Sequence, residues 1–236
     1  MLDRITEMDL AAARSGHAAA VARLFREATE PCARIITTIV GRRDVAAAVV
    51  KELHVRAARQ LEKWSTVEEA SRWFMHHTII LIREYRKPID SSNDVLLHEV
   101  GGPDVVQYQA LVGAIRKLPD QQQEAFLLTY AHRWNVRYCS IAMDCSTKAV
   151  ETHLTEARRQ VQPLCGESFD ALTGFLHQVH KSIPLELPDA PKIIAAKIVA
   201  RRSFRTLTTI AGWLLILLIV TAIVAAVVIL GPRIET

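Results

Sequence analysis

The pattern of apolar and polar positions divides most of the chain into helical segments. Apolar residues recur at spacings of three and four, which is typical of helices that bury one face. Nothing alternates with a period of two for long, so no strand is expected. We predict three long helices, within residues 17–40, 44–64 and 67–87, and four shorter ones within residues 105–164.

Breaks in this pattern set the expected domains. Pro, Ser, Asn, Asp and Gly cluster in "KPIDSSNDVLLHEVGGPD", which predicts a first helical domain at residues 1–87, a linker at 88–104 and a second helical domain at 105–166. The stretch "ESFDALTGFLHQVHKSI" then has an apolar stripe of helical period, which packs on its own domain or on a foreign partner. With a spacer carrying three prolines and a basic segment, it makes up residues 167–209.

Residues 210–230, "IAGWLLILLIVTAIVAAVVIL", contain no charge. At about 1.5 Å per residue they would cross a hydrocarbon core of about 30 Å, whereas a buried core helix is rarely uncharged for so long. The cations before this segment are Lys192, Lys197, Arg201, Arg202 and Arg205. Their excess predicts a single-pass protein of the inner (cytoplasmic) membrane, with its N-terminal body in the cytoplasm and a short tail, 231–236, outside.

Composition narrows the function classes. The 236 residues are 50% hydrophobic, with nine Gly and nine Pro, which excludes a disordered chain. A net charge of +4 permits nucleic acid or an anionic membrane surface as a partner without proving either. The four cysteines stand singly, and His76 and His77 are neighbours that point apart on a helix, so we expect no metal and no cofactor. Nucleotide-binding loops, nucleophile elbows and HExxH motifs are missing from the sequence, so we do not expect an enzyme.

The stretch "YCSIAMDCSTKAVETHLTEARR" predicts two short helices across a tight turn. Tyr138 to Met143 form the first, and Ser146 is a good N-cap for a second that runs from Thr147 to Val161. Apolar residues at steps of four and three bury one side of the second helix and leave a polar outer face. This geometry can place a recognition helix in a DNA major groove, although many helical hairpins in enzymes look similar.

Residues 118–164 closely resemble the C-terminal DNA-binding domain of bacterial sigma factors of the extracytoplasmic-function group, within the sigma-70 family. Leu118-Pro119 opens a helix, Glu124 precedes the apolar run Phe126-Leu127-Leu128, and Cys145-Ser146 occupies the turn, with no gap needed over the whole stretch. In that family this domain reads the −35 promoter element. The resemblance therefore implies that the following residues contact bases or phosphates: Lys148, Thr152, Thr155, Arg158 and Arg159.

The first domain is similar to the remaining part of such a factor. Residues 42–64 look like the helix that grips the core polymerase, which implies contacts from Val49, Lys51, Glu52, Leu53 and Arg56. Residues 71–87 look like the helix that melts and reads the −10 element, which implies DNA contacts from Trp73, His76, Arg83, Arg86 and Lys87. The chain departs from the family's pattern at 45–48, Lys51, His54 and Ile80.

The resemblance implies an all-α protein with a region two-like domain and a helix-turn-helix region four-like domain, and the uncharged segment 210–230 adds a fused C-terminal transmembrane helix. Its implied function is a membrane-tethered sigma factor that directs RNA polymerase core to promoter DNA, in an envelope or extracytoplasmic response. The alternative is a membrane-anchored helix-turn-helix regulator that has lost polymerase docking. Besides lipid, an anti-sigma factor or an intramembrane or site-specific protease is a regulatory partner that the tether suggests.

Overall fold

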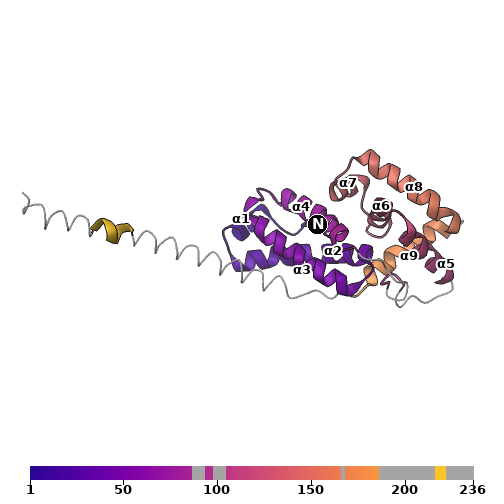
Figure 1. The fold of residues 1–236 in the computed structure, drawn as a ribbon, viewed down its shortest axis with the longest axis horizontal. Helices are drawn as coiled ribbons and strands as arrows, with labels where there is room; N and C mark the ends of the chain where they lie inside the picture. Colours follow the sequence, from indigo (N-terminus) through magenta and orange to yellow (C-terminus); the bar gives the residue numbers. More distant parts are fainter. Residues whose placement is uncertain (87–93, 98–104, 166–167, 186–215, 222–236) are drawn as a thin grey trace, which may run out of the picture.

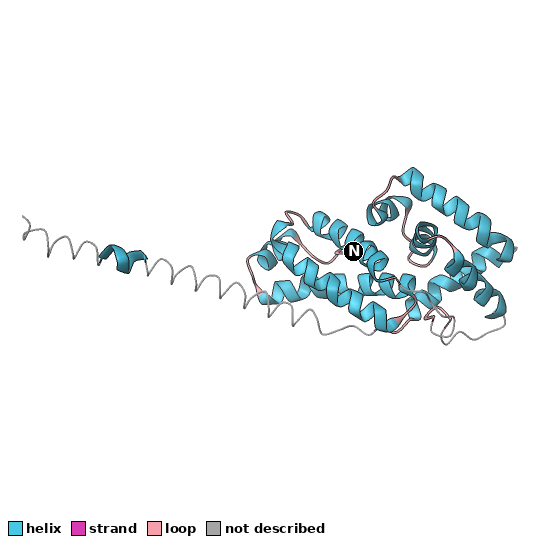
Figure 2. Cartoon of the chain, in the orientation of Figure 1, coloured by secondary structure: helices cyan, strands magenta, loops and turns pink. Residues whose placement is uncertain are grey.

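The computed structural model describes residues 1–86, 94–97, 105–165, 168–185 and 216–221. Every regular element in these ranges is a helix (Figure 2). The helices are α1 Glu7–Arg14, α2 Ala18–Val40, α3 Arg43–Gln60, the 3₁₀ turn η1 Leu61–Lys63, α4 Val67–Tyr85, α5 Val105–Lys117, α6 Asp120–Tyr130, α7 Val136–Met143, α8 Thr147–Cys165 and α9 Phe169–Ser182. The seven helices predicted from the sequence are present, although α8, expected to be one of the shorter four, has 19 residues and is as long as α4.

Helices α1 to α4 form the first of two bundles that lie side by side (Figure 1). The long helix α2 runs through it and packs against α1, α3 and α4. Phe25 of α2 meets the edge of Phe74 from α4, with ring centroids 6.2 Å apart, and both side chains are fully buried. Helix α1 was not predicted, although its capping box is readable in the sequence: the Thr6 hydroxyl accepts from the Asp9 amide, and the Asp9 carboxylate accepts from the Thr6 amide.

Helices α5 to α9 form the second bundle, with α6 at its centre. Six consecutive residues of α6, from Gln123 to Leu128, are buried, because α5, α7, α8 and α9 all pack around it. Helix α9 buries the apolar stripe predicted for it, so that stripe packs on this chain's own domain. Cys139 and Cys165 are buried here and Cys32 is buried in the first bundle, whereas Cys145 is half-buried.

Arginines join the two bundles by capping helix ends across the interface. Arg116 of α5 donates to the carbonyl oxygens of Thr38 and Ile39 in the last turn of α2, at 3.0 Å each. Arg34 of α2 in turn donates to the carbonyls of His180 and Lys181, at 3.0 and 2.9 Å, at the end of α9. Because the last carbonyls of a helix lack partners within the helix, each guanidinium satisfies them and neutralises the negative end of the helix dipole.

The predicted linker contains a segment that packs into this interface. This segment is residues 94–97, and its first residue, Asp94, has only 3% of its surface exposed. The Asp94 carboxylate accepts two hydrogen bonds from Arg116, at 2.7 and 2.9 Å. The amide of Val95 donates to the Gly41 carbonyl at 2.9 Å. The rest of the linker lies outside the described residues.

The predicted membrane span, 210–230, falls mainly on residues that the structure does not describe. Only its central part, 216–221, is described, and it is helical with exposed side chains. Within the described ranges, none of the helices combines the length and the apolar character needed to cross a bilayer. The proline-rich spacer after Leu185 and the basic segment before the span also lie outside the described residues.

Buried histidines make the stability of this fold depend on pH. The pKa of His180 is lowered to about 3 by burial and by the nearby charge of Arg34, and its Nδ1 lies 2.8 Å from the Thr38 hydroxyl. Burial also lowers the pKa of His54 to about 4. Between about pH 6.5 and these values the unfolded chain binds protons that the folded chain does not, so stability is lost as the pH falls.

We therefore expect the free energy of unfolding to fall between about pH 7 and about pH 5, by on the order of 1 kcal/mol per pH unit for each such histidine. Urea denaturation followed by circular dichroism at several pH values measures this slope. The His54→Gln variant should have a shallower slope than the parent protein. A free energy of unfolding that is flat or rises as the pH falls through this window would refute the assignment of neutral buried histidines.

Candidate nucleic-acid interface

Helices α7 and α8 are joined by a turn whose geometry fixes the direction of α8. Asn135 caps α7 by accepting from the Tyr138 amide at 2.9 Å. The helix ends at Asp144, which has left-handed backbone angles of φ 53° and ψ 52°. The Ser146 hydroxyl then accepts from the Ala149 amide at 3.1 Å, which confirms the predicted N-cap. The result is a helix-turn-helix with α8 as its second helix.

Helix α8 presents its polar face to solvent. Val150, Ala157 and Val161 are buried on its inner side. All five residues predicted to contact DNA on this helix are exposed. Four of them, at spacings of four, three and four, form one stripe, which we call the recognition stripe: Lys148, Thr152, Thr155 and Arg159. The fifth residue, Arg158, lies to one side of the stripe, and its guanidinium carbon is 5.4 Å from the centre of the Phe169 ring of α9.

Carboxylates beside the recognition stripe offset the positive charge of Lys148 and Arg159. Glu156 holds Arg159 by an ion pair in which both Nε and Nη2 of the arginine donate to the carboxylate. Lys148 has no ion-pair partner among the described residues. Glu151 and Glu156 line the same shallow depression of about 410 Å³ as Lys148, Thr152 and Thr155. Two carboxylates in this depression oppose the approach of a phosphate group.

Removing one of these carboxylates should strengthen DNA binding. We expect Glu156→Gln to raise the affinity for duplex DNA severalfold and to steepen the salt dependence by less than about one counterion, because Arg159 then contacts a phosphate without first leaving its ion pair with Glu156. Fluorescence anisotropy over a range of salt concentrations measures both quantities. Asp44→Asn is the control, since it removes a carboxylate from another arginine pair at the surface, that of Arg42 in the first bundle. Equal affinities for Glu156→Gln and the parent protein would show that Arg159 does not contact DNA.

Trp73, predicted to contact DNA from the melting helix, and its neighbour Phe74 both pack against other aromatic rings. Trp73 is half-buried and stacks on His77, with ring centroids 3.9 Å apart, and it also contacts Trp64 at 5.3 Å. Phe74 is fully buried and anchors α4 in the first bundle. His76 is half-buried. Part of Trp73 and part of His76 therefore remain accessible on the surface of α4.

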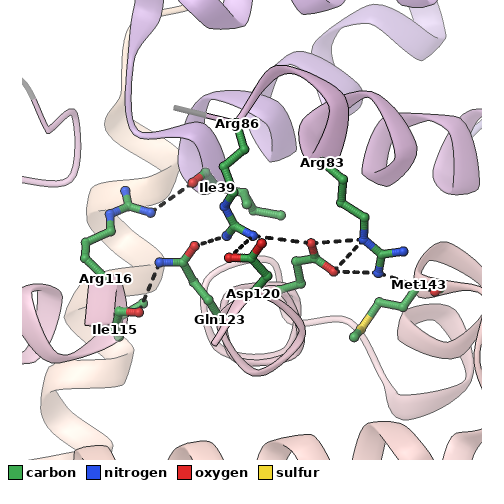
Figure 3. A network of polar contacts seen from close by, with 9 residues as sticks. Ile39, Arg83, Arg86, Ile115, Arg116, Asp120, Gln123 and Met143 are labelled. Atoms are coloured by element: carbon green, nitrogen blue, oxygen red, sulfur yellow. Dashed lines mark hydrogen bonds and ion pairs between the residues drawn. The ribbon is translucent and has the colours of Figure 1, made fainter. Parts of the chain in front are cut away.

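At the basic end of α4, the two predicted DNA-contacting arginines that the structure describes are paired with carboxylates of the second bundle. Arg83 forms an ion pair with Glu124 of α6 at 2.7 Å, and Arg86 forms one with Asp120 at 2.6 Å. Figure 3 shows both arginines extending from α4 toward α6. Lys87, the third predicted cation, lies outside the described residues.

Two of the predicted polymerase contacts need correction. Val49 and Leu53 are fully buried in the first bundle, and side chains without exposed surface cannot contact a partner. Lys51 is exposed. Arg56 is half-buried and donates to Glu52 and to Glu84 of α4, so its charge already has partners within the bundle. The pKa of Glu84 lies below its usual range because of the hydrogen bond from Arg56.

The second bundle thus holds a helix-turn-helix of the DNA-binding class. Residues 108–161, from within α5 to near the end of α8, match the family model described as Sigma-70, region 4. This match gives the chain a sigma-factor-like, promoter-recognising role in transcription, with RNA polymerase and promoter DNA as partners. A search of curated proteins and a search of solved structures found no match to the chain.

Proposed function

We propose that this protein is a membrane-tethered sigma factor of the extracytoplasmic-function group that directs RNA polymerase to promoters of an envelope response. The observation that carries the proposal is the exposed recognition stripe on α8, within the segment that matches sigma-70 region 4. In this proposal the stripe reads the −35 element, and α4 reads the −10 element with Trp73, His76, Arg83 and Arg86. The chain's chemistry is binding rather than catalysis.

A second candidate is a membrane-anchored helix-turn-helix regulator that binds DNA without docking on polymerase. The surface of α3 favours it, because two of the five residues expected to meet polymerase are buried and Arg56 is already paired with Glu52 and Glu84. The family match also begins at residue 108, after the whole first bundle. Binding of core polymerase separates the two candidates.

The membrane tether supplies the proposed regulation. The 21 uncharged residues at 210–230 and the basic segment before them support a single span with the helical body in the cytoplasm. A tethered factor reaches its promoters either when chromosomal loci approach the membrane or when a protease cuts the chain. An anti-sigma factor is a further partner that could hold it inactive.

A genome-wide DNA-binding profile of the tagged protein, compared with a version truncated after Pro184, tests this function. The truncation keeps every packed helix from α1 to α9. We expect the bound sites to lie upstream of transcribed genes and to share two sequence elements, with more sites occupied by the truncated version. Immunoblots after envelope stress should show a shortened band if proteolysis releases the body, and a single full-length band in inducing conditions argues against release. Bound sites scattered without shared elements would contradict promoter recognition.

A further inference from the structure

Two arginines at the C-terminal end of α4, one in its last turn and one directly after it, form a polar contact with three residues of α6, which we call the interdomain clasp. Its members are Arg83, Arg86, Asp120, Gln123 and Glu124. The Arg83 Nε lies 3.2 Å from both carboxylate oxygens of Glu124, and its Nη2 lies 2.7 Å from Oε2. Arg86 places Nη1 2.6 Å from Asp120 Oδ1 and donates through Nη2 to the Gln123 amide oxygen (Figure 3).

The clasp is centred on a buried charge. The Glu124 side chain has no exposed surface, and Arg83 and Arg86 are the cations that pair with it among the described residues. A buried carboxylate is strongly unfavourable unless cations and hydrogen-bond donors surround it. The charge of Glu124 is therefore stabilised by the two arginines at the end of α4, and these arginines are occupied by that ion pair.

As part of a sigma factor, α4 would bind DNA phosphates through Arg83 and Arg86. In this structure the two arginines bind carboxylates, which are also anions with oxygen acceptors. A guanidinium recognises carboxylate and phosphate by the same bidentate geometry, so a DNA phosphate and Glu124 compete for Arg83. Asp120 likewise occupies Arg86. The side chains that would hold DNA are in this way bound to carboxylates of the chain's own second bundle.

We infer that this structure is a closed, autoinhibited state in which Glu124 and Asp120 withhold Arg83 and Arg86 from promoter DNA. Opening the clasp is then a condition for α4 to bind a melted strand. The inference rests on the proposed function, because it takes α4 to be a DNA-binding helix. The clasp would then regulate DNA binding from within the chain, in addition to the membrane tether and any external inhibitor.

The clasp is one of several contacts that hold the bundles together. A pocket of about 520 Å³ lies farther along α4, between the N-terminal segment, α4 and α7, lined among others by Met1, Arg72, Met75 and Tyr138. The clasp itself is polar, and a buried ion pair gains little over the same two groups separated in water. The clasp by itself therefore adds only a modest margin to the closed state, beside the contacts of Arg34 and Arg116 and the packing of α4 on α7. A ligand that prefers the open state has to outweigh all of these contacts.

The test uses the full chain in detergent micelles, with a labelled single-stranded oligonucleotide of about 15 nucleotides as the probe. Glu124→Gln keeps the shape of the side chain and removes its charge. We expect it to raise the affinity for the probe about 5–10-fold, and Asp120→Asn about 2–3-fold. Asp120 is largely exposed, so its variant folds even if Glu124→Gln weakens α6. Adding Arg83→Gln and Arg86→Gln to Glu124→Gln should remove the gain.

Glu84→Gln is the matched control. It also removes one negative charge that pairs with an arginine, but the pair lies between α4 and α3 within the first bundle. We expect the control to leave the affinity for the probe within about twofold of the parent protein.

Spin labels on the exposed residues Lys51 and Gln162, in a Cys145→Ser background, report the distance between the bundles. We expect this distance to lengthen in both clasp variants and to stay unchanged in the control.

Longer distances together with tighter binding of the probe support the inference. Unchanged distance and unchanged affinity in both clasp variants overturn it, as does an equal gain in the control. Longer distances without any gain in affinity also overturn the inhibition, and in that case the proposed role of α4 in DNA binding fails with it. Failure of the sigma-factor function itself is recognised separately, because polymerase binding plays no part in these measurements.

Discussion

Replacing both Lys148 and Arg159 by alanine is expected to reduce the affinity for promoter duplex DNA by about 100-fold or more. The two cations stand on the exposed recognition stripe of α8, eleven residues apart, and thus about three helical turns from each other. Each contact to a phosphate or a base edge contributes on the order of tenfold in affinity. The buried face of α8 is unchanged by the substitutions, so the fold should remain intact.

Gel-shift or anisotropy titrations with a promoter fragment measure this loss. The control is the double variant Arg59→Ala, Lys63→Ala, which removes two equally exposed cations from the first bundle. It should change the affinity only slightly, and circular dichroism should show the same helix content in all three proteins. If the control loses as much affinity as the α8 variant, binding reflects overall charge rather than a recognition helix.

Replacing Arg116 by methionine is expected to destabilise the protein by about 3–5 kcal/mol. Arg116 is the partner of the buried Asp94 carboxylate and also caps the last carbonyls of α2. Methionine fills a similar volume but leaves a buried charge unpaired and two carbonyl oxygens without donors. The loss should appear in the midpoint of urea denaturation.

The combined variant Asp94→Asn, Arg116→Met should be less destabilised than the sum of the two single variants, because the unpaired charge is then absent. Arg42→Met serves as the control, since its pair with Asp44 lies at the surface and should matter far less. A loss below about 1 kcal/mol for Arg116→Met would contradict a role for this arginine in joining the bundles.

The helices could be predicted from the sequence because their signals are local. Helical periodicity located α2, α3 and α4, and Ser146 marked the start of α8 by a cap that needs only neighbouring residues. The five exposed residues of α8 followed from the same periodicity, since its apolar positions define the buried side. Helix α1 was missed because its eight residues bury only Leu10 and Ala13, which is too short an apolar pattern to stand out.

The contacts between the bundles could not be predicted in this way. Arg83 and Arg86 look from the sequence like a free basic helix end, and nothing local shows that α6 lies opposite them. One signal was present: Glu124 stands directly before "AFLL" in a helix buried on nearly all sides, and a carboxylate there requires a cation from elsewhere. The partner could be identified only once the fold placed α4 beside α6.

The burial of Val49 and Leu53 was, in contrast, within reach of the sequence. Val45, Val49, Leu53 and Ala57 repeat at intervals of four and form one buried side of α3. The resemblance implied polymerase contacts from Val49 and Leu53, which belong to that buried side. Helical phase alone would have left Lys51, which is exposed, as the candidate contact from that helix.

The most direct test of the central claim is run-off transcription with bacterial core RNA polymerase of the same organism, supplemented with the full chain in detergent. The account predicts transcripts from one start site on a promoter found by the binding profile, and more of them with Glu124→Gln. The Lys148→Ala, Arg159→Ala variant should produce none. Absence of transcripts with both the parent protein and Glu124→Gln, while both still bind the promoter fragment, would contradict the sigma-factor function and favour the regulator without polymerase docking.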